Sequence, residues 1–442
     1  MKVDGERVKK LFVVAGAAIA LVAGMVCTVP SAYAGGTIKV DDDKWISVGM
    51  GTRTSFSMKE DGSGGGGQWS NSFGVDNARI YINGKIHKYV GFEFNTECFN
   101  CPRSGQAAGG PTSNTFGSNS NMGLLDAIGK FEINELVNVW FGRMLVPTER
   151  GELNGPFYHA VYDGFRTPLN PADFSTNFGA GGAGMYGRDN GVTFFGRIHP
   201  GGTHLQYAAG VFTGTQSGLV GVGGTGPNLR NSLKYAGRLT WNLLNEEKNP
   251  GYYTSGTYYG TAGDILAIAV GGEYQNTAAG SLLNPAPFGA FTSDLLFEKV
   301  LPDKGVFTFN AEYKRYWAGN LASFTDASTF DPVTNPNATN FPIFAGTSVT
   351  AYALYLFPQE VGIGRFQPYG RYTFVNGVHS SALDEFEGGV NYVISGHNAR
   401  ISTWWRHGNV APAGGPAQSG FSPTGIGGPH QDSFHVALQL QY

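Results

Sequence analysis

Hydrophobic and polar side chains alternate with a period of two along many segments of about ten residues in this chain. Between 307 and 314 the aromatic and apolar side chains occupy the odd positions, and residues 433–442 show the same alternation up to Tyr442. Such a period is typical of a β-strand with one apolar and one polar face. After Gly35 no apolar run reaches the ~18 residues that a membrane-spanning helix needs. The pattern therefore predicts an all-β chain.

The connections between the predicted strands alternate between short and long. Short turns at one rim and long loops at the other are typical of outer-membrane β-barrels, which have an even number of strands. We therefore predict a transmembrane antiparallel β-barrel of about 16 strands, with short periplasmic turns and long extracellular loops. Within the link 244–263, residues 252–259 could themselves form a strand. The predicted strands lie near 45–58, 73–87, 90–98, 124–134, 137–146, 186–198, 204–213, 232–243, 264–275, 292–300, 306–317, 348–357, 365–375, 385–394, 399–407 and 432–442.

The amino-acid composition supports a barrel with a water-filled interior. Only 14% of the 442 residues are charged, compared with ~25% in soluble domains, whereas 67 are Gly and 13% are aromatic. The terminal Tyr442 resembles the C-terminal signal by which bacterial outer-membrane barrels are recognised for insertion. The net charge of −3 gives no electrostatic support for a nucleic-acid partner.

The N-terminus has the features of an export signal. Four basic residues precede an apolar stretch at 11–26, and Ala32-Tyr33-Ala34 matches a cleavage site. We therefore predict that 1–34 is a cleaved signal peptide and that 35–442 form one barrel. The expected location is the outer membrane of a Gram-negative-type bacterium.

Two cysteines, Cys98 and Cys101, follow this predicted signal peptide. Because exported proteins meet an oxidising compartment, we interpret them as a short disulfide at the base of a loop. A redox-active pair stays open as an alternative, although it would require a helix N-terminus to lower the thiol pKa. No second ligand pair has the spacing of a zinc site.

Motifs for catalysis are weak. Gly221 to Gly226 match G-x-G-x-x-G, but they lie in a glycine-rich stretch without the strand-to-helix context that a dinucleotide site needs. No metalloprotease, serine-hydrolase or P-loop motif is found. We therefore expect no enzymatic activity, no cofactor and no metal.

The longest connection, 147–185, mixes aromatic residues with charges of both signs. We predict that it folds into the barrel and narrows the channel, with Arg150 and Arg166 facing acidic residues across the pore; a surface loop is the alternative. The candidate constriction residues are Glu149, Arg150, Glu152, His159, Asp163 and Arg166. Basic residues at alternating strand positions are candidates for the pore wall, where they would favour anions: Arg79, Lys130, Arg143, Arg197, Arg238, Lys314 and Arg371.

Three short segments, 77–85, 89–95 and 138–144, carry a family resemblance. They read NARIYINGK, YVGFEFN and NVWFGRM, and their order resembles that of the phosphate-selective porin O and P family. The resemblance is clearest over 73–170. It implies a trimeric sixteen-stranded porin whose third loop narrows the pore. Where family members often carry arginines just before Arg79, this chain has Asp76 and Asn77.

Together these features predict a porin that lets small polar solutes and ions, with some preference for anions, diffuse passively. The expected partners are outer-membrane lipid, lipopolysaccharide and two further copies of the chain. A barrel plugged by its loops, acting in adhesion or as a structural anchor, is the alternative function.

Overall fold

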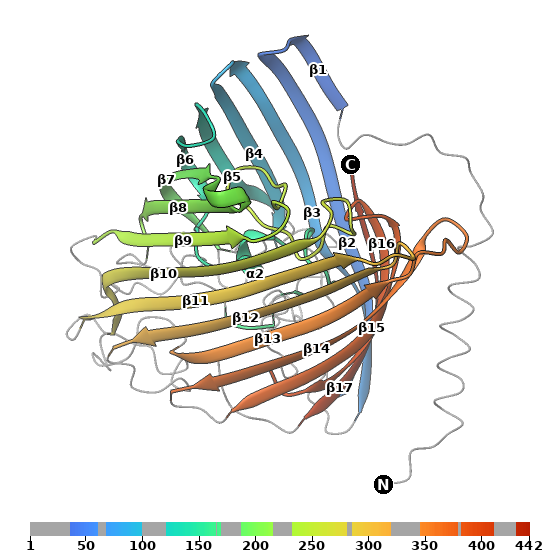
Figure 1. The fold of residues 1–442 in the computed structure, drawn as a ribbon. Helices are drawn as coiled ribbons and strands as arrows, with labels where there is room; N and C mark the ends of the chain where they lie inside the picture. The colour runs from blue at the N-terminus through green and yellow to red at the C-terminus, as the bar shows by residue number, and fades with distance from the viewer. Residues whose placement is uncertain are drawn as a thin grey trace.

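The computed structural model describes residues 36–60, 68–99, 121–164, 166–168, 187–214, 232–280, 285–319, 345–378, 382–410 and 430–442. These residues form one antiparallel sheet of seventeen strands, sixteen of which close into a barrel (Figure 1). The strands are β1 (Gly36–Asp41), β2 (Lys44–Glu60), β3 (Trp69–His87), β4 (Val90–Phe99), β5 (Asn121–Glu132), β6 (Asn138–Leu145), β7 (Arg188–Ile198), β8 (His204–Phe212), β9 (Lys234–Asn242), β10 (Ile265–Gly280), β11 (Pro285–Val300), β12 (Val306–Ala318), β13 (Gly346–Leu356), β14 (Arg365–Gly377), β15 (Leu383–Ser395), β16 (Ala399–Gly408) and β17 (Gln431–Gln441). The connections contain a short helix, α2 (Arg150–Leu153), and a 3-10 turn, η2 (Pro200–Gly202).

The barrel closes where β17 pairs with β2. Their register runs from Ser433↔Lys59 to Gln441↔Gly51, and the backbones of Met50 and Tyr442 exchange two hydrogen bonds. Every strand from β2 to β17 thus has two neighbours, so no backbone edge is left open around the ring.

One strand was not predicted. β1 pairs with the first residues of β2, from Gly36↔Val48 to Asp41↔Lys44. β17 ends at Gln441, opposite Gly51, so the start of β2 extends beyond its reach. β1 occupies this free edge, which explains why a strand outside the ring forms there.

The sixteen predicted strands correspond one to one to β2–β17, which confirms the predicted fold class. Two connections differ from the prediction. Residues 276–291 are mostly strand rather than loop, because β10 and β11 continue pairing as far as Gly280↔Pro285. Residues 252–259 form no strand, and the 22 residues between β9 and β10 turn into the barrel instead.

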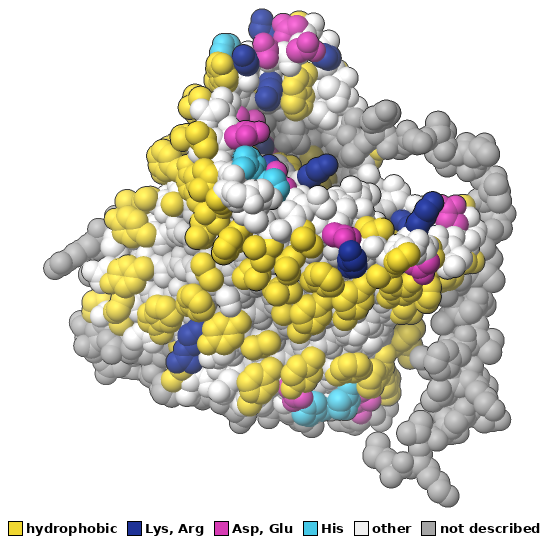
Figure 2. Space-filling view, in the orientation of Figure 1, with side chains coloured by type: hydrophobic (Ala, Val, Ile, Leu, Met, Phe, Trp, Pro, Cys, Tyr) yellow, Lys and Arg dark blue, Asp and Glu magenta, His cyan; other side chains and the backbone are white. Residues whose placement is uncertain are grey.

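The two faces of the wall differ in chemistry. In β9, Tyr235, Leu239 and Trp241 are exposed on the outside, whereas Lys234 and Arg238 are buried. Figure 2 shows hydrophobic side chains spread over the outer face of the strands, with charged side chains gathered near the rims. Within the described residues no helix is long and apolar enough to span a membrane.

Candidate functional site

The connection after β6 enters the barrel and follows its inner wall. Of the predicted loop 147–185, the structure describes 147–164 and 166–168. Residues 146–164 and 166–168, called here the third loop, include α2, where the backbone N–H of Gly151 donates to Glu312 Oε2 at 2.7 Å. A Cβ added to Gly271 on β10 would lie 2.2 Å from the carbonyl oxygen of Thr148. A glycine in the wall therefore lets the backbone of the loop approach the strand closely.

Arg150 is the centre of a buried ion-pair network. Its guanidinium binds both carboxylate oxygens of Glu247 at 2.7 Å and Asp294 Oδ1 at 2.9 Å. Asp294 also binds Arg238 of β9 through two hydrogen bonds. Burial disfavours the charge of Arg150, but Glu247 and Asp294 outweigh this cost and raise its pKa well above its ordinary value. The network joins the third loop to the wall on one side and to the β9–β10 connection on the other.

Beside this network lies a group with an excess of carboxylates, called here the acidic cluster. Lys314 lies between Glu149 and Glu312, at 2.9 and 3.2 Å, and Lys234 lies between Asp189 and Glu273, at 3.2 and 3.5 Å. The buried carboxylate of Glu152 interacts electrostatically with both lysines. Among the described residues the acidic cluster contains five carboxylates and two ammonium groups: its members are Glu149, Glu152, Asp189, Lys234, Glu273, Glu312 and Lys314.

The other end of the third loop is held by a group of arginines and carboxylates, called here the arginine cluster. Arg166 Nε donates to Glu385 Oε1 at 2.7 Å, and Arg406 Nη2 lies 3.0 Å from Asp163 Oδ2. The members of the arginine cluster are Asp163, Arg166, Arg371, Glu385, Glu387 and Arg406. These ion pairs anchor the loop to β14, β15 and β16. The three arginines and three carboxylates balance, so the cluster has no net charge.

Aromatic residues fix the middle of the third loop. The ring of Tyr162 stacks on Trp404 with centroids 5.2 Å apart, and Arg53 lies 3.9 Å above the Tyr162 ring. The hydroxyl of Tyr162 donates to Asp76 Oδ2 at 2.6 Å. Phe157 is fully buried against Arg79, at 5.2 Å. Cation–π contacts and ring packing therefore hold the loop against β2, β3 and β16.

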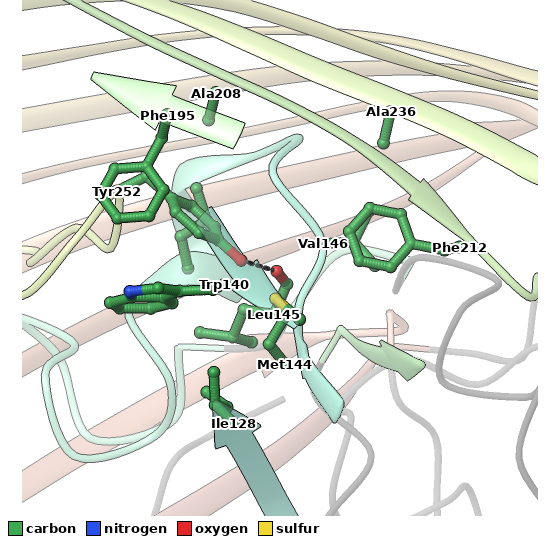
Figure 3. Packing of buried hydrophobic residues seen from close by; sticks show 11 residues of the cluster. Ile128, Trp140, Met144, Leu145, Val146, Phe195, Ala208, Phe212, Ala236 and Tyr252 are labelled. Atoms are coloured by element: carbon green, nitrogen blue, oxygen red, sulfur yellow. Dashed lines mark hydrogen bonds between the residues drawn. The ribbon is translucent and has the colours of Figure 1, made fainter. Parts of the chain in front are cut away.

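The connection between β9 and β10, residues 243–264 and called here the inner turn, also lies inside the barrel. Its Tyr252 packs on Trp140 and Phe195, with centroids 5.4 and 5.3 Å away, and donates to the carbonyl oxygen of Leu145 (Figure 3). A Cβ on Gly251, whose φ is +56°, would lie 2.4 Å from the Trp140 ring. The aromatic run of the inner turn is thus buried by packing on side chains and not by strand pairing.

Two histidines lie where these segments meet. Burial and the nearby Arg53, Arg371 and Arg400 lower the pKa of His159 in the third loop well below its ordinary value. Burial and Arg400 lower the pKa of His397, in the turn between β15 and β16, to about 3. His397 Nε2 donates to the carbonyl oxygen of Thr257 at 2.9 Å. Both rings are therefore neutral at ordinary pH.

The structure places the predicted residues as follows. All six candidate constriction residues belong to the third loop inside the barrel. The candidate wall residues each have a partner: Arg79 with Glu97, Lys130 with Glu93, Arg143 with the Leu125 carbonyl oxygen, Arg197 with Glu246, Arg238 with Asp294, Lys314 with Glu149 and Glu312, and Arg371 with Glu387.

The predicted pairing within the third loop is different in the structure. Arg150 faces Glu247 and Asp294 of other elements, not Glu149 or Glu152. Arg166 lies 3.7 Å from Asp163 in its own loop, but its closer partner is Glu385 of the wall. A buried guanidinium needs carboxylates that reach it from several directions, and here the wall and the β9–β10 connection supply them.

Several interior residues were not identified from the sequence. Period-two alternation could have found those on strands, since they share the polar face with residues that were identified. Glu247 lies outside any strand, and no such pattern marks it. The missed residues are Arg53, Arg188, Glu247, Asp294 and Glu385.

Cys98 is disulfide-bonded. Cys101 lies outside the described residues, so its pairing with Cys98 stays a prediction. The predicted signal peptide, 1–34, also lies outside them.

A closed antiparallel barrel with an apolar outer face, a charged interior and a loop folded inside defines a porin-like fold. No family model matches the chain, and no curated protein matches its sequence. Solved structures do match. OmpF of Salmonella typhi, in complex with daunomycin, is 12% identical over 92% of this chain and 100% of its own, with a TM-score of 0.51. OprB of Pseudomonas putida, at high pH, is 8% identical over 90% and 94%, with a TM-score of 0.53.

Proposed function

We propose that the protein is a porin of the outer membrane of a Gram-negative-type bacterium, through which small polar solutes and ions diffuse passively. The observation that carries this proposal is the inversion of polarity across a closed wall. Apolar side chains cover the outside, where lipid would contact them, and charged side chains line the inside. The signal peptide at 1–34 and the Cys98–Cys101 disulfide belong to the same proposal.

The charges of the interior are unevenly distributed. The acidic cluster has an excess of carboxylates on the side of β7, β9, β10 and β12. On another side, Arg53 and Arg400 donate to carbonyl and amide oxygens of Tyr162, Asn77, His159, Ala160 and Gln439. Opposite charges facing each other across a passage create a transverse field, which favours small polar solutes with modest ion selectivity. This wall-to-wall arrangement replaces the pairing predicted within the third loop.

The resemblance of residues 73–170 to the phosphate-selective porins adds a homotrimer embedded in lipid and lipopolysaccharide. We do not extend the proposal to phosphate as the solute, since Asp76 and Asn77 stand where that family often has arginines. A preference for anions would rest on the arginines of the wall.

Planar-bilayer recording of the purified, heat-modifiable protein tests the proposal. We expect stepwise conductance, and we expect Arg53→Gln combined with Arg400→Gln to shift the reversal potential in a salt gradient towards cations. The matched control is Arg315→Gln, because Arg315 is exposed and binds Thr347 on the outside. A folded barrel without conductance would instead support the alternative of a structural barrel plugged by its loops.

A further inference from the structure

The inner turn is unusually long for its position in the barrel. It connects β9 to β10 at the rim of short turns, where the other turns have two to eight residues between strands, yet it has 22. Several of its wall contacts lie near that rim: Trp140 near the start of β6, Glu298 near the end of β11 and His397 in the turn between β15 and β16. The inner turn therefore enters the barrel from the end opposite to the third loop.

The inner turn and the third loop meet directly. The backbone N–H of Gly256 donates to the Tyr158 carbonyl oxygen at 2.9 Å, and that of Thr254 to the Leu153 carbonyl oxygen at 3.3 Å. A Cβ added to Gly256 would lie 2.5 Å from the Ala160 nitrogen. No side chain separates the two backbones at this point.

Polar side chains reinforce this contact. Thr254 Oγ1 lies 2.6 Å from Asn154 Oδ1, and Arg150 Nη1 donates to the Ser255 carbonyl oxygen at 3.1 Å. The bidentate pair of Arg150 and Glu247 is nearly inaccessible to solvent, with 1% and 6% of the side chains exposed. A buried, bidentate pair of this kind is strongly position-specific.

Together the two segments cross the interior. The inner turn contacts β6, β7 and β8 through Trp140, Phe195 and Gln206. The third loop contacts β14, β15 and β16 through Arg371, Glu385 and Arg406. In the closed ring these groups of strands stand eight positions apart, that is, on opposite walls. A solute that passes along the barrel must therefore pass this bridge.

We infer that the inner turn is a second selectivity element of the channel, built from the short-turn end, and that the Arg150–Glu247 ion pair joins it to the third loop. This inference rests on the proposed channel function. It assigns the size limit of the passage to two segments that hold each other, rather than to the third loop alone. Releasing either one should widen the passage.

Single-channel recording with three kinds of variant tests the inference. Glu247→Gln keeps the side chain's shape but removes its charge, and we expect frequent steps to at least twice the parent conductance. Glu135→Gln is the matched control, since Glu135 lies in the short turn between β5 and β6, outside the inner turn, with 80% of its side chain exposed. It should conduct like the parent. Replacing residues 250–260 by a short Gly-Asn turn should make the wider state permanent, provided the variant remains heat-modifiable.

A reversible cross-link keeps the test independent of whether the shortened variant folds. In Glu247→Gln, the added pair Asn154→Cys and Thr254→Cys should form a disulfide that returns the conductance to the parent level. Reduction should restore the large steps, with the reduced parent as control for the disulfide of Cys98.

The outcomes separate the two proposals. If the parent conducts and all variants conduct like it, the inner turn does not limit the passage and the inference is wrong, while the channel function stands. If the parent is silent and the shortened variant conducts, the inner turn is the barrier, as inferred. Silence of every folded variant would overturn both the channel function and the inference.

Discussion

In the part of the chain that the structure describes, two connections leave the rims of the barrel and fold inside, and their sequences differ in kind. The third loop carries charges of both signs and is anchored by ion pairs to the wall, such as Arg166 with Glu385. The inner turn is rich in Tyr, Thr, Ser and Gly and is anchored mainly by ring packing and hydrogen bonds, with one ion pair, Glu247 to Arg150, towards the loop. The comparison shows that charge patterning marks one inward segment, whereas the other has the composition of a strand.

The aromatic inner turn resembles a strand because β-propensity measures how well a side chain fits a half-buried surface. Tyr252 and Tyr258 find that burial inside the barrel, where the hydroxyl of Tyr258 also donates to Glu247 at 2.8 Å. Burial raises the pKa of Tyr258 well above its ordinary value, with Glu247 adding to the shift. The same composition therefore serves either strand pairing or docking in the interior.

The largest effect is expected where the two segments meet. Arg150→Met removes the common partner of Glu247 and Asp294 and leaves Glu247 buried without its guanidinium. Breaking a buried pair by removing one partner costs roughly 3–5 kcal/mol. Urea unfolding in lipid vesicles should show a loss of this size. An unchanged midpoint would mean that the two segments are held independently.

The ring packing that anchors the inner turn is tested at Trp140, which is fully buried against Tyr252, Tyr253 and Phe195. Trp140→Ala should lower the free energy of unfolding by about 3 kcal/mol, because it leaves a cavity that the turn cannot fill. The control is Trp241→Ala on the outer face, where 49% of the side chain is exposed. Equal losses in the same unfolding experiment would show that the inner turn is not docked on Trp140.

The contact of the inner turn with His397 should depend on pH. The unfolded chain binds the proton near pH 6.5, whereas burial lowers the folded pKa to about 3. Between these values the unfolded state holds more protons, so the free energy of unfolding falls as the pH falls below 6.5. At 1.36 kcal/mol per pH unit, the loss by pH 5 is up to about 2 kcal/mol.

His397→Gln retains a donor for the Thr257 carbonyl oxygen and lacks the titrating ring. From pH 7 to pH 5 the urea midpoint of the parent should therefore fall relative to the urea midpoint of the variant. Parallel pH profiles for the two proteins would contradict this account of His397.

The smallest effect is expected at the exposed boundary of the inner turn. The hydrogen bond from Lys299 lowers the pKa of Asp264, aided by the backbone N–H of Val300. Both side chains of this pair are substantially exposed, at 47% and 30%. Lys299→Ala should therefore change the free energy of unfolding by less than about 1 kcal/mol, in thermal or urea unfolding. A loss comparable with that of Arg150→Met would mean that the rim, not the buried network, holds the turn.

Much of the barrel was predictable from local pattern, and the reason is geometric. Side chains of a strand alternate between two faces. In a wall with lipid on one side and charge on the other, hydrophobic and polar residues therefore alternate with a period of two along each strand. β9 is an example, with Leu239 and Trp241 outside and Arg238 and Thr240 inside. The prediction that residues 147–185 fold inward used a different signal, because a mixture of aromatic residues and charges suits a buried environment with partners.

The sequence by itself therefore determined the barrel and its sixteen strands, since these depend on spacing along the chain. Only the tertiary structure decided which charges meet. Arg150 and Glu247 are 97 residues apart, and Arg166 and Glu385 are 219 apart. The inner turn and β1 were likewise decided by what the closed barrel leaves open: a buried aromatic surface at Trp140 and the unpaired start of β2. Both are properties of the assembled ring, which no local pattern contains.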